Sequence, residues 1–119
     1  MASKRQMQVS ELIKRHFSDV LREEGYYIYG SALVTVTQVE LTPDLSLASI
    51  YVSIFNVEDK ELALEQIKEN LWKLKQNLAK RIRNKVRRIP QLRLFLDETL
   101  DELSRIDELI AKYKNNSSS

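Results

Sequence analysis

The sequence contains no cysteine, and it has only two glycines, two prolines and one histidine among its 119 residues. The absence of cysteine excludes a disulfide framework, a thiolate nucleophile and a zinc ribbon. Two isolated glycines cannot form a glycine-rich phosphate loop. The apolar runs are too short to span a bilayer, and the amino-terminal residues do not lead into an apolar segment of the signal-peptide kind. We therefore expect a soluble, cytoplasmic protein.

The length favours one domain, and the apolar share of 43% is enough to form a hydrophobic core. The last residues are polar and end in three serines, a composition that is typical of disordered tails. We expect a single domain over residues 1–113 and a disordered polar tail over residues 114–119.

Charge is distributed very unevenly along the chain. Between Lys73 and Arg93 there are nine basic residues and no acidic one, so this stretch carries a formal charge of +9. The remainder has ten basic and seventeen acidic residues, a balance of −7, and the whole chain carries only +2. Such segregation indicates a polyanionic partner more strongly than the average charge does.

The first half of the chain predicts a helix followed by two strands. The helix has one apolar face, begins near residue 4 with Ser3 and Gln6 as a capping box, and ends at Gly25. Residues 33–41 and 47–55 are rich in β-branched side chains and flank a turn that contains proline and aspartate. We expect these two strands to form an antiparallel hairpin.

The second half predicts helix, strand and helix. An apolar stripe over residues 64–86 has the helical period, and lysines within it suggest that the helix kinks or ends close to Asn84. Leucines alternate over residues 92–96, and Thr99 with Glu102 forms a capping box for a last helix. The order fits an α+β fold with helices on one face of a three-stranded sheet. One core is expected from Ile50, Val52, Ile54, Leu71, Leu74, Leu78, Leu92 and Leu94.

Candidates for catalysis are weak. His16 lies on the apolar face of the first helix, and the sequence offers no second metal ligand or nucleophile beside it. Glu40 and Asp44 bracket a turn, where acidic side chains commonly have structural roles. We interpret all three as structural residues, and we expect neither an enzyme nor a cofactor or metal site.

The basic stretch is the strongest candidate site. Helical geometry centred on Leu78 predicts that one solvent face carries Lys73, Gln76, Lys80, Arg83 and Arg87 without interleaved acids. This face could bind a phosphate backbone, or it could be a solvated surface neutralised by the acidic segment 97–108.

Four aromatic residues are open to two interpretations. Trp72 lies at the edge of the cationic face, where it could stack on unpaired bases, but packing against the first or the last helix is the favoured interpretation. Tyr26, Tyr27 and Tyr29 could form a binding surface, but a lid over the edge of the core is the favoured interpretation.

Five segments carry a family resemblance, and they are the hairpin segments 36–45 and 48–53, the helical segment 78–83, the segment 88–97 and the ending 106–110. Together, in this order, they resemble the ribosome-binding factor A family. The similarity runs from the first helix to the last. It implies a type II KH-like domain of αββααβ order, with a kink near residues 70–72 where the family commonly has Ala-x-Gly.

The resemblance also implies a function. It implies a non-enzymatic assembly factor that binds the 30S small ribosomal subunit, assists late processing and maturation of 16S rRNA, and supports growth in the cold. We expect the free protein to be a monomer. The alternative is a protein-interaction module whose basic helix docks an acidic partner. The predicted RNA-binding residues are Trp72, Lys73, Lys75, Lys80, Arg81, Arg83, Lys85, Arg87, Arg88 and Arg93.

Overall fold

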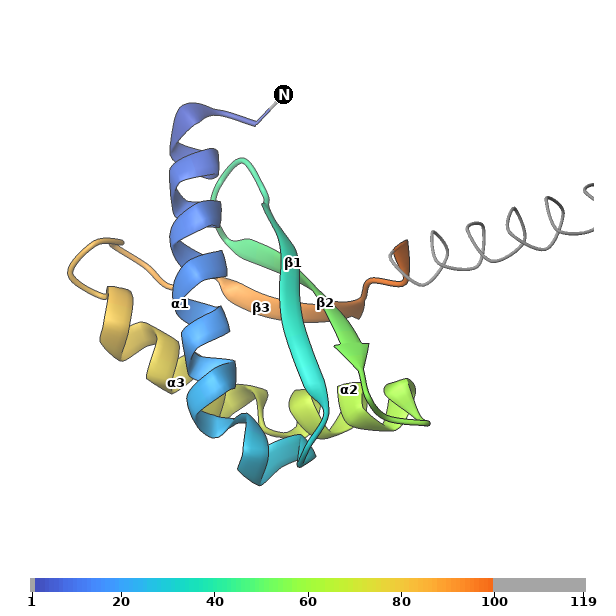
Figure 1. Ribbon diagram of the computed structural model, residues 1–119. Helices are drawn as coiled ribbons and strands as arrows, with labels where there is room; N and C mark the ends of the chain where they lie inside the picture. The colour runs from blue at the N-terminus through green and yellow to red at the C-terminus, as the bar shows by residue number, and fades with distance from the viewer. Residues whose placement is uncertain (1, 100–119) are drawn as a thin grey trace, which may run out of the picture.

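The computed structural model describes residues 2–99 and contains three helices and three strands within that range (Figure 1). The predicted capping box of Thr99 with Glu102, the last helix and the tail 114–119 lie wholly or partly outside the described residues. The elements are α1 (Lys4–Tyr29), β1 (Leu33–Leu41), β2 (Leu47–Phe55), α2 (Lys60–Glu69), α3 (Leu71–Ile82) and β3 (Gln91–Leu96). Their order confirms the αββααβ prediction, and both hairpin strands have the predicted bounds.

The three strands form one sheet in the order β1-β2-β3, with β1 antiparallel and β3 parallel to β2. The even-numbered residues of β2, from Ala48 to Ile54, are fully buried beneath the helices, and Leu92 and Leu94 of β3 continue the same apolar row. The fold is therefore α+β, with its core between the sheet and the helices.

The register of β1 contains a bulge. Pairing with β2 shifts between Val36 and Gln38, so Thr37 is an extra residue in the strand. Strict alternation would place Val36 and Val39 on opposite faces, whereas the bulge turns both into the core, where both are buried. The Thr37 hydroxyl instead donates a hydrogen bond to the carboxylate of Asp97 just beyond β3.

Helix α1 begins as predicted and ends later than predicted. The Ser3 hydroxyl accepts from the Gln6 backbone at 3.1 Å, and the Gln6 side chain accepts from the Ser3 backbone at 2.7 Å. Gly25 does not end the helix, which continues to Tyr29 and stops at Gly30, with φ of 69°. Gly25 is buried against the ring of Tyr29, so a β-carbon there would collide with that side chain. The glycine permits close packing inside the helix rather than termination.

The long apolar stripe is divided between two helices. Asn70, with φ of −104° and ψ of 11°, separates α2 from α3, and its side-chain amide donates to the Gln66 carbonyl at 2.9 Å. This confirms the break near residues 70–72 that the family resemblance implies. Helix α3 then ends at Ile82, close to Asn84 as expected.

The predicted core residues gather in one cluster. Seven of the eight are buried, and the eighth, Leu71, is half-buried and packs against the cluster. Helix α1 contributes Ile13 and Phe17, both with no exposed surface. The periodic apolar rows of sheet and helices therefore meet as expected.

Candidate nucleic-acid interface

Helix α3 divides its basic residues between two flanks. Leu74, Leu78 and Ile82 face the core at the helical spacing, which directs the residues between them to the sides and the solvent. Helix α1 lies along one of these flanks (Figure 1). The division decides which cations stay available for a partner.

The flank next to α1 is neutralised. The Lys73 ammonium lies 3.4 Å from a Glu24 carboxylate oxygen, and Arg81 forms ion pairs with Glu23 and with Asp19, the latter at 3.7 Å. The sequence-based alternative named the acidic segment 97–108 as the compensating group. Among the described residues, α1 supplies the acids instead.

The solvent side of α3 and the flank away from α1 keep their charge. Lys75, Lys80 and Arg83, which we call the α3 patch, form no ion pair with any residue of the range 2–99. Lys80 and Arg83 are exposed and Lys75 is half-buried. At 100° per residue, Trp72 and Gln76 lie on this same side of the helix. The α3 patch is therefore cationic, with an aromatic ring at its amino-terminal end.

The α3–β3 loop carries three more cations. The sequence-based prediction continued the helix through Arg87, and this is wrong because α3 ends at Ile82. The backbone amides of Lys85 and Val86 both donate to the Ile82 carbonyl, which turns the chain out of the helix. Val86 and Pro90 are buried, whereas Lys85, Arg87 and Arg88 are exposed. Two apolar anchors thus hold the loop while its cations face solvent.

A groove lies where the α2–α3 junction meets β3. It is lined by Lys68, Leu71, Arg93, Leu94 and Phe95 and has a volume of about 360 Å³. The Phe95 ring stacks on Tyr51 of β2, with centroids 5.3 Å apart. Arg93 belongs to β3, so it lines this groove and is not part of the α3 patch. Sequence reasoning missed Lys68 and Phe95 because only tertiary packing forms the groove.

The exposed aromatic residues correct two predictions. Trp72 is 64% exposed, so the interpretation that it packs against the first helix is wrong, and the last helix lies outside the described residues. Tyr26 and Tyr27 are 75% and 84% exposed, so they do not form a lid, and their rings meet edge to face at 6.1 Å. Tyr29 alone of the three packs inward, with its hydroxyl donating to the Leu21 carbonyl.

The exposure of Trp72 leads to a fluorescence prediction. We expect acrylamide to quench the single tryptophan efficiently in the free protein, because most of the indole is in contact with solvent. Saturating single-stranded RNA should reduce this quenching if bases stack on the ring. Poor quenching of the free protein would contradict the exposed position, and unchanged quenching with RNA would remove Trp72 from the interface. Trp72→Phe provides the blank.

Two of the candidates for catalysis have lowered pKa values. The pKa of His16 is lowered below its usual value. Burial is the largest cause, and the positive charges of Lys85, Arg15 and Arg81 add to it. Hydrogen bonds from Ser46 and Thr42 lower the pKa of Asp44 to about 2, so this carboxylate stays ionised and holds the β1–β2 turn.

Within residues 2–99, no three histidine or acidic side chains gather in a way that could hold a metal ion. No helix in that range is long and apolar enough to cross a bilayer.

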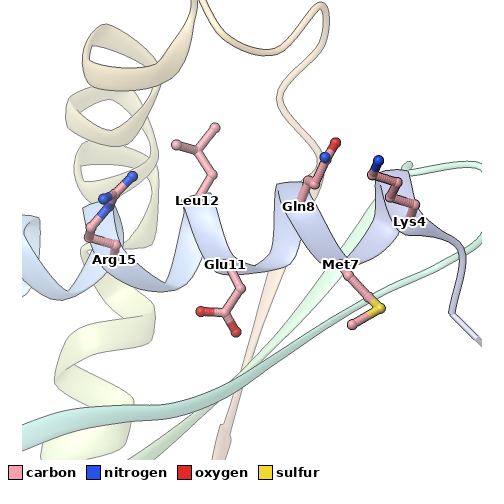
Figure 2. A pocket seen from close by; sticks show the side chains of 6 residues that line it. All are labelled: Lys4, Met7, Gln8, Glu11, Leu12 and Arg15. Carbon is pink, nitrogen blue, oxygen red and sulfur yellow. The ribbon is translucent and has the colours of Figure 1, made fainter.

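A hollow of about 750 Å³ runs along the amino-terminal half of α1. Figure 2 shows that Lys4, Gln8 and Leu12 point to one side of the helix, whereas Met7 and Glu11 point to the other. Arg15 points to the same side as Lys4 and Gln8, so Glu11 is the one polar group on the other side, and all six lining residues come from a single helix. This hollow is not a candidate site.

Comparison with known proteins identifies the family. The sequence pattern of the family described as Ribosome-binding factor A matches residues 5–110. The chain belongs to this family. Ribosome-binding factor A of Cytophaga hutchinsonii is 36% identical over 112 residues, which cover 94% of this chain and 84% of that protein. The Flavobacterium johnsoniae protein is 37% identical, over 97% of this chain and 89% of that protein.

Solved structures agree with this membership of the ribosome-binding factor A family. The crystal structure of ribosome-binding factor A from Thermus thermophilus is similar with a TM-score of 0.65 at 26% identity, and the match covers 76% of this chain and 94% of that one. A homology model of the Thermus thermophilus protein, fitted into a cryo-EM map of a 30S complex, gives a TM-score of 0.60 at 28% identity, covering 74% and 90%.

Proposed function

We propose that this protein is a ribosome assembly factor that binds the 30S small subunit through 16S rRNA and assists late processing and maturation of that RNA, without catalysing a reaction itself. The observation that carries the proposal is the division of the basic stretch. Helix α1 neutralises Lys73 and Arg81, and the cations that remain unpaired are those of the α3 patch, those of the α3–β3 loop and Arg93 of β3.

The physical basis is phosphate binding by exposed cations. Lysine and arginine side chains that approach an RNA backbone release condensed counterions, and this supplies affinity with little sequence preference. The groove beside β3 and the exposed Trp72 add apolar surfaces on which unpaired bases can stack. Such a surface fits folded rRNA, which offers both phosphates and unpaired bases.

The family supports the choice of partner. The Thermus thermophilus relative was fitted into the map of its complex with the 30S subunit, and the same fold is present here. We further propose that residues 1–113 form one RNA-binding domain, which acts as a monomer in the cytoplasm and supports growth in the cold. No observation in the described residues favours docking to an acidic protein partner over this function.

A salt titration tests the proposal. For the unmodified protein and purified small subunits, we expect the logarithm of affinity to fall linearly with the logarithm of salt concentration, with a slope of roughly −0.7 to −0.9 per phosphate contact. Several contacts should therefore give a slope of several units, measured by co-sedimentation between low and moderate salt. A slope near zero would contradict phosphate binding and would favour an apolar protein interface instead.

A further inference from the structure

A second cationic site lies beside the β1–β2 turn, where three segments of the chain meet. A cavity of about 140 Å³ is lined there by Arg5 from the first turn of α1 and by Arg87 and Arg88 from the α3–β3 loop. Val9 and Val86 are the buried apolar residues of its lining. Arg5 is 82 residues from Arg87 in the numbering of the chain, so only the fold brings these side chains to one cavity.

The three arginines have no partner among residues 2–99. No ion pair or hydrogen bond joins the side chain of Arg5, Arg87 or Arg88 to a described residue. Asp44 is the one acidic residue in the cavity lining, and its carboxylate already accepts hydrogen bonds from Thr42 and Ser46 within the turn. The charged groups of the lining therefore sum to +2, and like charges held around one cavity repel each other unless an anion lies between them.

Helix stability does not explain the position of Arg5. Lys4 and Arg5 occupy the first turn of α1, which contains no acidic residue. The helix dipole disfavours cations at this end, and Ser3 already caps a backbone amide there. Arg5 is thus unfavourable for the helix, but it increases the positive potential at the cavity beside the amino-terminal end, where anions bind well.

We propose that this cavity binds a phosphate group of an RNA backbone, with Arg5, Arg87 and Arg88 as its donors. The inference rests on the proposed function, and it extends the interface from α3 to the amino-terminal end of α1. Guanidinium groups suit the task because each presents planar pairs of N–H donors that match phosphate oxygens. Free phosphate shares this chemistry, so the experiment needs one arm for each source.

The first arm uses inorganic phosphate and the full chain. We expect phosphate, but not chloride at equal ionic strength, to shift the NMR signals of the arginine side-chain Nε–Hε groups of Arg5, Arg87 and Arg88. Arg5→Gln should weaken these shifts for the two loop arginines. Lys4→Gln is the matched control, because it removes the same charge from the same helical turn but lies outside the cavity lining. Equal shifts with chloride and phosphate would overturn the inference.

The second arm uses small subunits. We expect Arg5→Gln to reduce the salt slope of binding by about one unit and Lys4→Gln to leave it unchanged. Two results would overturn the inference. One is identical binding by the two variants, and the other is a phosphate response that depends on Arg5 without any effect on subunit binding. Both leave the proposed function intact, because that function is tested separately by the salt slope of the unmodified protein and by variants of the α3 patch.

Discussion

Replacing Lys80 and Arg83 together with glutamate is expected to lower the affinity for small ribosomal subunits by roughly 100-fold at moderate salt. Both side chains are exposed and have no acidic partner among residues 2–99, so their charge is available to phosphates. The double variant removes two attractive contacts and places two repulsive carboxylates on the α3 patch. Co-sedimentation with small subunits measures the loss, and the salt slope should fall by about two units.

The variant should fold normally, because neither side chain belongs to the apolar face of α3. The matched control reverses two exposed cations of α1, Lys4→Glu with Arg15→Glu, which lie along the hollow of Figure 2. This control changes the net charge by the same amount and should have a much smaller effect. If the Lys80 and Arg83 variant folds and binds as tightly as the unmodified protein, the α3 patch is only a solvated surface.

The second large effect concerns stability. Leu74→Ala is expected to lower the free energy of unfolding by about 2–5 kcal/mol, because Leu74 has no exposed surface and its truncation leaves a cavity beneath α3. Urea denaturation followed by circular dichroism gives this value from the shift of the midpoint at constant slope. Subunit binding should weaken only as far as the folded fraction falls, since Leu74 is buried away from any partner.

Leu62→Ala is the matched control for this substitution. Leu62 lies on α2 and is 57% exposed, so the same truncation removes little buried surface and introduces a residue of higher helix propensity. We expect a change within about 0.5 kcal/mol. A loss below about 1 kcal/mol for Leu74→Ala would contradict the packing of α3 described above.

Local patterns were sufficient to predict most of the fold. The capping box at Ser3, the bounds of both hairpin strands and the inward row of β2 depend on interactions between residues that are near in sequence. The prediction that Gly25 ends the helix was wrong because this glycine makes room for another side chain. The ring of Tyr29, one helical turn further on, packs against Gly25 inside a helix that continues. The bulge at Thr37 is likewise fixed by pairing with β2 rather than by the local sequence of β1.

The candidate site was predicted only in outline. The sequence located the cations but could not show that α1 neutralises Lys73 and Arg81, because the acids responsible lie 49 to 62 residues earlier. A helical wheel extended beyond Ile82 misplaced Arg87, since it could not detect the turn that ends α3. Arg5 was missed entirely for the same kind of reason: its neighbours are near in space and remote in sequence.

The parallel pairing of β3 with β2 has a kinetic consequence. The hairpin of β1 and β2 closes through a short turn. By contrast, Leu47 pairs with Gln91 only when the chain closes a loop that contains all of α2 and α3. Closure of the longer loop costs more chain entropy, so contacts of this kind form late during folding. During synthesis β3 also emerges last of the three strands. The loop cations and Arg93 are fixed only when β3 docks, so a nascent or partly folded chain has its hairpin before it has its complete set of surface cations.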